Sequence, residues 1–536
     1  MHVAAAIAFV LAVPTRDDAV AIESGRVTGK SAGEGVRAYL GIPFAAPPVG
    51  PLRWRPPEPP APWQGVRACD HFGPSCPQPI SAMSASGGGG GEQSEDCLYL
   101  NVWTPTASQD AKLPVMVWIH GGGFFLGSGS GTSYDGANLA RRQVVVVTIN
   151  YRLGPFGFLG HPALSKESPH GASGNYGLLD QIAALQWVQK NVAAFGGDPG
   201  SVTIFGESAG AFSVGCLLVS PLARGLFHRA IAESGAAIWI ARGLREPGMR
   251  EEPVEVVGER VVLALVGGTP ASSGGEPPSP IAAARAKSAE ELLAAAKPTL
   301  RLLGGGEGNV FGPAIDGWVV PDAPWRLFES GRVNVVPLLI GSNADEGTLF
   351  VGSAPPASLD QEAAAMRAVY GPIADRLLAY YSVEKWGDPS RVRAELIADS
   401  TFVAPTRAQV RAMAQAGAPC FVYHFTRVAG GARRTRLGAF HASEIAYVFG
   451  NLQSDLLRTY DANDGRLSAT MMNGWVQFAR TGDPNGDGLP SWHAYVEEED
   501  GHLEFGDEVK TGSGLHGEAC DLWDEAFTAW REHARR

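Results

Sequence analysis

Ser208 is the residue whose surroundings point most directly to covalent chemistry. It lies in the segment G-E-S-A-G, residues 206–210. Residues of high strand propensity, Val202 to Phe205, precede this segment, and the small, apolar-rich stretch Ala211 to Val219 follows it. A strand, a sharp turn and a helix in this order form the setting of a nucleophile elbow, in which a serine hydroxyl is exposed for attack.

Two glycines explain how such a turn could be accommodated. Gly206 and Gly210 flank Ser208 at positions where a Cβ atom would crowd the strand and the helix. The strained turn lifts the serine Oγ clear of the backbone and brings the N–H of Ala209 to the helix N-terminus, facing a developing oxyanion. The alternative is a chance match, since the chain contains 68 glycines.

A second glycine cluster supplies further candidate donors for that oxyanion. The sequence H-G-G-G-F, residues 120–124, comes directly after Val115 to Ile119, an apolar run typical of a buried strand. Glycines let the backbone turn with its N–H groups pointing into a site and no side chain in the way. Gly122, Gly123 and Ala209 are therefore the predicted oxyanion hole, and the alternative is a plain glycine loop.

A nucleophilic serine also needs a base and an acid that orients the base. In elbow enzymes the acid and then the histidine follow the serine along the chain. After the predicted strand Val335 to Ile340 come Asp345 and Glu346, and either could be the acid. After the predicted strand Cys420 to Phe425 comes His441, which lies in a loop of small residues. Twelve histidines compete for the role of base, and His441 is the one in such a loop.

The elements that must position these residues alternate between strand and helix. Leu98 to Trp103, Val144 to Asn150 and Arg229 to Glu233 are predicted strands, and Leu178 to Phe195 has apolar residues at helical spacing. This alternation predicts an α/β fold with a mostly parallel sheet. We expect residues 22–536 to form one domain. A partly helical, cap-like insertion is expected at about 241–327, with a Gly/Pro/Ser-rich connection at 267–280.

The composition excludes several classes of function. The chain has 536 residues, 45% of them hydrophobic, and a formal net charge of -12. The calculated pI is about 5.5. Binding to nucleic acid or to anionic membranes requires clustered positive charge, so neither is expected. No apolar run reaches the length of a membrane span.

The N-terminus has two interpretations. Val3 to Val13 is long enough for the apolar region of a signal peptide, and Ala19 to Ala21 has the small-x-small form of a cleavage site. Against this, no basic residue precedes the run, charged residues crowd the site, and cleavage after Ala21 would trim an expected first strand. Residues 1–21 are thus a signal or a disordered start, and secretion or a periplasmic location is favoured over the cytoplasm.

Taken together, the motifs resemble the type B carboxylesterase family, which includes para-nitrobenzyl esterases and cholinesterases. The resemblance covers essentially the whole chain after about residue 20. The segments that carry it are G-I-P-F-A-A-P-P-V-G, S-E-D-C-L-Y-L-N-V-W, H-G-G-G-F, N-Y-R-L-G-P-F-G-F-L, F-G-E-S-A-G, D-E-G and G-A-F-H. It implies the α/β-hydrolase fold and a serine esterase that hydrolyses small-molecule esters without a metal or organic cofactor.

The resemblance also implies roles for single residues. The triad of the family corresponds to Ser208, Glu346 and His441, which decides between Glu346 and its neighbour Asp345. The oxyanion hole of the family corresponds to the three N–H groups predicted above. Glu207 and Ser234 match residues that support the histidine and the acid.

Structural carry-overs follow from the same resemblance. Cys76 and Cys97 match the first disulfide of the family, and their loop includes the five-glycine run Gly87 to Gly91. Two ion pairs that the family buries correspond to Arg53 with Glu95 and Arg152 with Asp180.

The sequence departs from the family at several positions. Cys520 matches a cholinesterase disulfide cysteine whose partner position here is an alanine near residue 404, and Cys420 is the only nearby alternative. After His441, where the family commonly has glycine, stands Ala442. The cholinesterase choline site is not recognisable, so choline specificity is not expected.

Two other functions were weighed against ester hydrolysis. The same site could act on a thioester, lactone, carbamate or polyester. A non-catalytic binding protein of this fold would require the loss of a triad residue, and Ser208, Glu346 and His441 are all present.

Overall fold

The computed structural model describes most of the chain. The N-terminal apolar run, nearly all of the five-glycine run and most of the connection at 267–280 lie outside the described residues. Val20–Ile22 forms the first strand, so cleavage after Ala21 would remove part of it. The described residues are 19–80, 91–105, 109–240, 242–248, 251–267, 279–300, 308–351, 359–431, 436–454 and 458–533.

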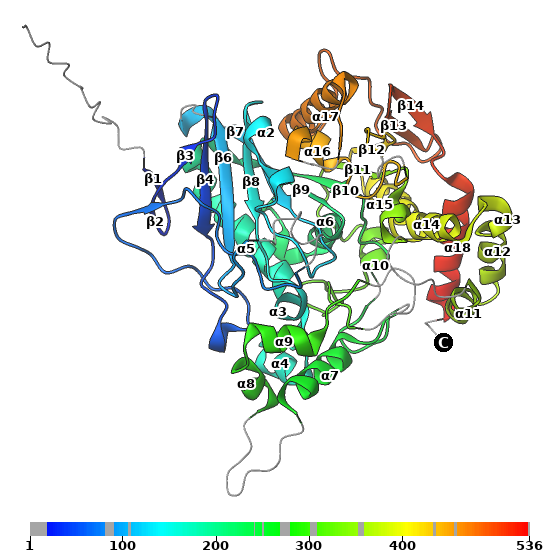
Figure 1. Cartoon of the computed structure of the whole chain (residues 1–536), viewed down its shortest axis with the longest axis horizontal. Helices are drawn as coiled ribbons and strands as arrows, with labels where there is room; N and C mark the ends of the chain where they lie inside the picture. The colour runs from blue at the N-terminus through cyan, green and yellow to red at the C-terminus, as the bar shows by residue number, and fades with distance from the viewer. Residues whose placement is uncertain are drawn as a thin grey trace, which may run out of the picture.

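A large sheet forms the centre of this part of the molecule (Figure 1). Its strands are β3 (Lys30–Ser31), β4 (Val36–Pro43), β6 (Tyr99–Pro105), β7 (Leu113–Ile119), β8 (Val145–Ile149), β9 (Gly197–Glu207), β10 (Arg229–Glu233), β11 (Leu338–Asn343), β12 (Cys420–Phe425), β13 (Gly501–Phe505) and β14 (Val509–Ser513). A smaller sheet contains β1 (Val20–Ile22), β2 (Gly25–Thr28) and β5 (Val66–Ala68).

The order of strands in the large sheet is β14-β13-β12-β11-β10-β9-β7-β8-β6-β4-β3. From β13 to β8 in this order every neighbouring pair is parallel. The pairs outside this span, at both edges, are antiparallel. The predicted α/β class with a mostly parallel sheet is therefore confirmed.

Helices flank the sheet. They are α2 (Ala137–Ala140), α3 (Gly154–Phe158), α4 (Pro162–Glu167), α5 (Tyr176–Asn191), α6 (Ala209–Val219), α7 (Val254–Val266), α8 (Pro280–Arg285), α9 (Ala289–Ala296), α10 (Pro324–Glu329), α11 (Leu359–Tyr370), α12 (Ile373–Tyr380), α13 (Val383–Trp386), α14 (Pro389–Ile397), α15 (Ala404–Gln415), α16 (Ile445–Val448), α17 (Ala462–Thr481) and α18 (Gly517–His533). Among those described, none combines the length and the hydropathy that crossing a bilayer requires.

The apolar run of β7 shows why the central strands are buried on both faces. Val115, Val117 and Ile119 belong to the hydrophobic core that also contains the buried residues of α5 and α6. Met116 and Trp118 point the other way, into the core shared with α17. Successive side chains of a strand alternate between its faces, so a strand covered by helices on both sides must be apolar throughout.

The elements expected from the sequence are present with small shifts. The strands predicted over Arg229–Glu233 and Cys420–Phe425 have those bounds as β10 and β12. The strand predicted over Val335 to Ile340 begins and ends three residues later, as β11. The predicted helix at Leu178 to Phe195 consists of α5 followed by a 3-10 turn.

The inserted region carries α7 to α10 in its described part. In Figure 1, α7, α8 and α9 lie together below the sheet, near α4. Val257, Ile281 and Leu292 from these helices belong to the same hydrophobic core as β7. The division into one domain with a cap-like insertion stays a prediction.

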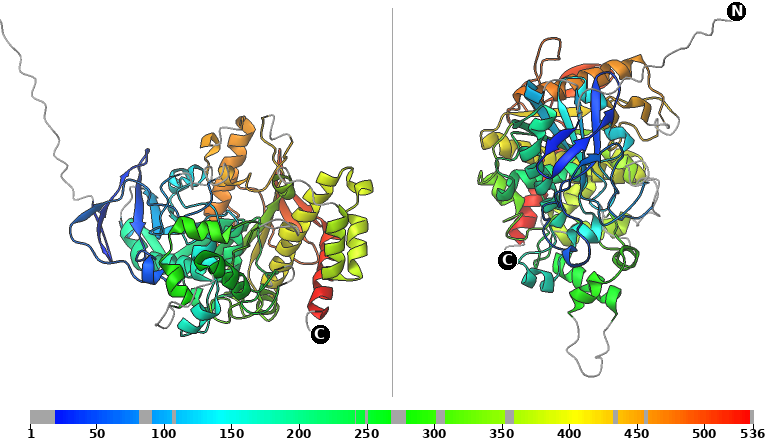
Figure 2. Two further views of the ribbon diagram at one scale, coloured as in Figure 1. Left: turned by 60° about the horizontal axis from the view of Figure 1, so that its bottom comes forward. Right: turned by 90° about the vertical axis from the view of Figure 1, so that its left-hand side faces the viewer.

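The late helices form a separate group at one end of the molecule. Figure 2 shows α11 to α14 beside the red C-terminal helix α18, far from the N-terminal sheet. Tyr370, Leu377, Val392 and Trp523 share one hydrophobic core there. This group closes one side of the cavity described below, since Tyr370 and Trp523 also line that cavity.

Both ion pairs inferred from the family resemblance are present. The Nε and Nη2 atoms of Arg152 donate to the two carboxylate oxygens of Asp180 at 2.8 and 2.7 Å. Arg53 Nε donates to Glu95 at 2.7 Å, and Arg53 Nη1 donates to the backbone carbonyls of Ala284 and Lys287. The second pair thereby ties the N-terminal segment to the inserted region.

The cysteines are free thiols in the structure, and all are buried. A hydrogen bond with Cys76 is the main cause that raises the pKa of the Cys97 thiol. The two thiols therefore lie next to each other. Their disulfide stays a prediction. Cys420 and Cys520 contact different carbonyl oxygens, those of Ala418 and Leu515, and do not bond each other.

Removing one partner of the Arg152–Asp180 pair should destabilise the fold strongly. The two side chains are 2% and 0% exposed, so Arg152→Met leaves a buried carboxylate without its partner. We expect a loss of about 3–5 kcal/mol in the free energy of unfolding, measured by urea denaturation. The double variant Arg152→Met/Asp180→Leu should recover part of that loss. An Arg152→Met protein as stable as an Arg55→Met surface control would contradict the prediction.

Candidate active site

Ser208 occupies the sharp turn between β9 and α6. Its backbone has φ 55° and ψ −122°, a region that residues other than glycine rarely adopt. The turn is fixed from a neighbouring strand, because the N–H of Ser208 donates to the carbonyl of Glu233 at 2.9 Å. The serine is thus held in a strained conformation at the N-terminus of α6.

The glycines on either side are required by space, as the sequence predicts. A Cβ atom on Gly210 would lie 1.9 Å from the carbonyl oxygen of Ile119. A Cβ atom on Gly206 would lie 2.6 Å from that same oxygen and 2.7 Å from the carbonyl carbon of Gly210. The elbow therefore packs its backbone directly against the end of β7.

The glycine loop after β7 lies beside the serine. A Cβ atom on Gly121 would lie 3.2 Å from the Cβ of Ser208. Gly122 and Gly123 have φ values of 106° and 61°, and no acceptor for their N–H groups is found among the described residues. Ala209 is the first residue of α6, where an N–H group has no acceptor within the helix. Among the described residues, therefore, none of the three N–H groups predicted for the oxyanion hole has an acceptor, and each is available to donate to an oxyanion.

His120 holds the glycine loop in place. Its Nδ1 lies 2.8 Å from the carbonyl oxygen of Gly121, and its ring stacks on Tyr151 at 4.5 Å. Tyr151 in turn donates its hydroxyl to the carbonyl of His120 at 2.9 Å. Burial lowers the pKa of His120 to about 4, so the ring is neutral at neutral pH and serves to hold the loop.

His441 and Glu346 are in direct contact. The Nδ1 of His441 lies 2.6 Å from Oε2 of Glu346, whose other oxygen accepts the N–H of Asn343 at 2.7 Å. The Glu346 carboxylate is completely buried. The neighbouring Asp345 points elsewhere: it pairs with Arg391 at 3.2 Å and accepts the N–H of Ala439 at 2.9 Å.

Beyond Glu346, the imidazole of His441 is surrounded by a second carboxylate and by two aromatic rings. The Nε2 of His441 lies 3.1 Å from Oε1 of Glu207, without hydrogen-bond geometry. The rings of Phe350 and Phe402 lie 5.0 and 4.6 Å from the imidazole ring. Ala442 has φ 67°, so the position where the family commonly has glycine demands a conformation that alanine adopts at a cost.

Further buried carboxylates surround the histidine. Burial is the main cause that raises the pKa of Glu207 to about 8, of Glu444 to about 7 and of Glu233 well above its usual range. Burial alone would lower the pKa of His441, but Glu207 and then Glu346 outweigh it and raise that pKa to about 9. The site therefore retains protons that the same carboxyl groups would release in water.

Two of these carboxylates were not predicted from the sequence. Glu233 Oε1 accepts from the indole of Trp475 at 2.7 Å, and a carboxylate oxygen of Glu444 accepts from Asn343 Nδ2. Each glutamate belongs to an otherwise apolar run, at the end of β10 and just before α16, and an acid in such a run is the signal that could have identified them. Ser234, predicted to support the triad, is fully buried, and its hydroxyl has no partner among the described residues.

A cavity of about 310 Å³ opens above Ser208. Gly123 and Ala209 line it together with the serine, and most of its wall is apolar, with nine aromatic side chains. Phe350 and Phe402, which pack on His441, contribute to that wall, whereas His441 itself is not among the lining residues. The aromatic lining consists of Phe124, Phe212, Trp239, Phe311, Phe350, Tyr370, Phe402, Trp523 and Phe527.

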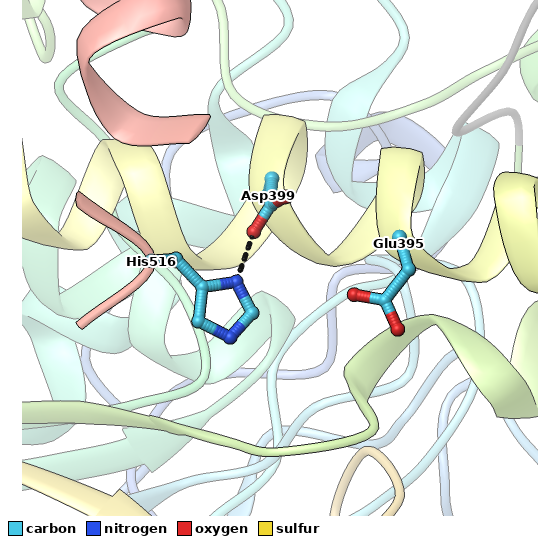
Figure 3. A group of neighbouring side chains, drawn as sticks. All are labelled: Glu395, Asp399 and His516. Atoms are coloured by element: carbon cyan, nitrogen blue, oxygen red, sulfur yellow. Dashed lines mark hydrogen bonds and ion pairs between the residues drawn. The ribbon is translucent and has the colours of Figure 1, made fainter. Parts of the chain in front are cut away.

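One group in the described residues has the composition of a cation site. Glu395, Asp399 and His516 bring their ligand atoms within 4.8 Å of one another. Figure 3 shows Asp399 and Glu395 on successive turns of one helix, with His516 bonded to Asp399. Each acid is already engaged, Asp399 with His516 and with the hydroxyl of Tyr381 at 2.7 Å, and Glu395 with Arg391. These contacts give the three residues a structural role, which is to connect that helix to the segment before α18.

Comparison with known proteins identifies the family of this chain. The model of the carboxylesterase family matches residues 16–523. The chain belongs to this family. Fumonisin B1 esterase from Sphingopyxis macrogoltabida is 39% identical over 503 residues, which cover 92% of this chain and 87% of that protein. Para-nitrobenzyl esterase from Bacillus subtilis is 38% identical over 498 residues, covering 89% of this chain and 93% of that protein.

Solved structures agree with the sequence relationship. A PNB esterase structure matches with a TM-score of 0.81 at 37% sequence identity, covering 94% of this chain and 99% of that one. This carboxylesterase is therefore a carboxylic ester hydrolase with the α/β-hydrolase fold, as the resemblance of its motifs implied.

The proximity of Glu207 to His441 should be visible in the pH dependence of the carboxylesterase. A negative charge on Glu207 raises the pKa of His441, so Glu207→Gln should lower that pKa. The acidic limb of the pH profile of kcat/KM, which reports the base of the free enzyme, should then move to lower pH by about one unit or more. Glu384→Gln, on the remote helix α13, is the control. If the acidic limb of Glu207→Gln coincided with that of wild type, the prediction would be wrong, and Glu207 would already be protonated at the pH where His441 titrates.

Proposed function

We propose that the protein is a serine carboxylesterase that forms an acyl-enzyme on Ser208. The observation that carries the proposal is the placement of this serine. Its strained backbone holds it at the floor of a cavity that Gly123 and Ala209 also line. A nucleophile and its oxyanion donors must share one wall in this way, because they act on the same carbonyl group.

The chemical steps follow from the groups around the cavity. His441 takes the proton of Ser208 at Nε2 while the serine Oγ attacks the ester carbonyl. The tetrahedral oxyanion accepts hydrogen bonds from the N–H groups of Gly122, Gly123 and Ala209. Nε2 then returns the proton to the leaving alcohol, and a water molecule repeats the sequence on the acyl-enzyme. Apart from the ester and this water molecule, the steps use only groups of the protein.

Glu346 acts through the histidine in this proposal. Its contact of 2.6 Å with Nδ1 keeps the proton on that nitrogen, which leaves Nε2 as the atom that takes the proton of Ser208 in this proposal. Its hydrogen bond from the N–H of Asn343 fixes the carboxylate against β11. The carboxylate also stabilises the imidazolium that forms in the transition state.

Glu207 and Ser234 are proposed as supporting residues. Glu207 lies against Nε2 and favours the charged imidazole. Ser234 follows β10 with φ 54°, and its N–H donates to the carbonyl of Gly341 at 2.9 Å. It thereby holds the turn after β10 to β11, the strand that leads to Glu346.

The substrate class follows from the cavity wall. Apolar side chains, nine of them aromatic, line most of it, so the favoured substrates are carboxylic esters with a sizeable apolar group on the acyl or alcohol side. Two of the relatives are named for fumonisin B1 and for para-nitrobenzyl esters. Their names differ in substrate, and the property they share is ester hydrolysis.

Ser208→Ala should abolish hydrolysis of 4-nitrophenyl butyrate while leaving the protein folded. Removal of Oγ removes the acyl-enzyme route, so kcat should fall by about 10³-fold or more. Ser400→Ala is a matched control, since Ser400 lines the same cavity without contacting the triad in this proposal. Mass spectrometry after treatment with an organophosphate should locate the label on Ser208, and a label on any other residue would contradict the assignment.

Glu346→Gln and Asp345→Asn should have very different effects. The amide of the first variant cannot stabilise the imidazolium, so kcat should fall by about 10³-fold or more at little cost in thermal stability. The second variant alters the residue that pairs with Arg391 and should retain most activity. If Asp345→Asn caused the larger loss, Asp345 would be the orienting acid.

A further inference from the structure

A second cavity adjoins the one above Ser208. Its volume is about 290 Å³. The two cavities share Arg242, Glu251 and Val310 in their linings. The first cavity is mostly apolar, whereas the second is lined mainly by charged side chains. A substrate that fills the apolar first cavity and extends beyond it therefore enters a cavity lined by charges.

Two chain segments frame both cavities and meet at Arg242. The segment after β10 contributes Trp239 and Arg242, and the segment 308–313 contributes residues to both linings. The N–H of Ile315 donates to the carbonyl of Arg242 at 2.9 Å, and Arg242 Nη1 donates to the carbonyl of Val310 at 2.8 Å. The guanidinium is thereby fixed at the boundary between the two cavities.

Arg242 is a buried cation whose ion pairing with the described residues is weak. Its side chain is only 5% exposed, and the one carboxylate paired with it among those residues, that of Glu251, lies 3.9 Å away and is 37% exposed. Its Nε and Nη1 bond backbone carbonyls, and no hydrogen bond of Nη2 to the described residues is found. Burial is the main cause that lowers the pKa of Arg242, which means that its charge would be stabilised by a further anion.

The remaining charges of the second cavity leave an excess of positive charge. Arg260 is engaged by Glu252 at 2.6 Å. Lys297 is exposed, lines the cavity, and forms no ion pair with the described residues. Against Arg242, Arg260 and Lys297 stand the two acids Glu251 and Glu252. Within the part of the chain that the structure describes, Lys297 has no ion pair and Arg242 has only the 3.9 Å contact with Glu251.

We propose that the second cavity is a subsite for a carboxylate carried by the substrate several bonds away from the ester that is cleaved. The enzyme then prefers half-esters of dicarboxylic or polycarboxylic acids, with the hydrocarbon part on the aromatic wall and the carboxylate between Arg242 and Lys297. A guanidinium suits this role because its planar array of N–H donors matches a carboxylate. The inference rests on the proposed function, since it extends the substrate from the same serine.

The test compares charged and neutral esters of equal size. The probes are 4-nitrophenyl half-esters of adipic, suberic and sebacic acid, each paired with the compound whose free carboxylate is replaced by a primary amide. A second series carries the same carboxylate and amide on the alcohol side of a butyrate ester. The quantity measured is the ratio of kcat/KM for the carboxylate and the amide. Wild type should favour the carboxylate by about tenfold or more at the best length in at least one series.

Variants assign that preference to the cavity. Arg242→Met should reduce the ratio by about tenfold or more, Arg242→Lys should restore part of it, and Lys297→Met should reduce it less. Glu251→Gln removes the competing acid and should raise the ratio. Lys190→Met, an exposed lysine on α5, should leave it unchanged. Lys297 and Glu251 are exposed enough to be replaced without loss of the fold, so the test stands if Arg242→Met does not fold.

The outcomes separate the two proposals. If wild type hydrolyses the amide-bearing esters and Ser208→Ala does not, the proposed function holds whatever the charge preference. A wild-type ratio near one in both series, or a ratio that Arg242→Met and Glu251→Gln leave unchanged, would overturn the carboxylate subsite. Failure of wild type to cleave both the carboxylate-bearing and the amide-bearing esters would contradict the proposed function instead.

Discussion

The candidate site depends on one close contact between backbones. The start of α6 presses so tightly on the end of β7 that the Cβ atom of any other residue at Gly210 would meet the carbonyl oxygen of Ile119 at 1.9 Å. The serine turn belongs to one side of this contact, and the glycine loop begins on the other. Their relative position is therefore set by the rigid core of the sheet, since β7 and β9 are paired neighbours. Side chains with free rotamers have no part in that alignment, and this is the precision that oxyanion stabilisation requires.

A second constraint is electrostatic. Four buried glutamates, Glu207, Glu233, Glu346 and Glu444, lie near one imidazole, and each must be balanced by a donor or a proton. The donors come from separate elements, an asparagine at the end of β11 and a tryptophan of α17 among them. These hydrogen bonds connect the end of β11 to the segment before α16, and the end of β10 to α17. The charge state is a property of the group, because Glu207, Glu444 and the imidazole of His441 affect one another's pKa values.

The sequence predicted the parts that local physics determines. Apolar runs such as β10 and β12 can only be buried strands in this alternating pattern, and glycines at fixed spacing mark a turn that no other residue fits. The choice between Glu346 and Asp345 could not be derived in this way, because it depends on which carboxylate faces a loop 95 positions further along the chain. Glu233 and Glu444 were missed for the same reason. Arg242 was missed because the inserted region has no periodic pattern that would show which side chains face a cavity.

The order of strands also has a consequence for how the protein comes into being. Ser208, Glu346 and His441 follow β9, β11 and β12, and the last of these strands becomes available only when most of the chain has been synthesised. Domains fold during synthesis as their elements emerge, but a parallel sheet must wait for partners that are distant in sequence. A growing chain on the ribosome therefore carries the serine turn long before it carries His441, the proposed base. If that proposal holds, hydrolytic activity is gained only after the loop that follows β12 has been synthesised.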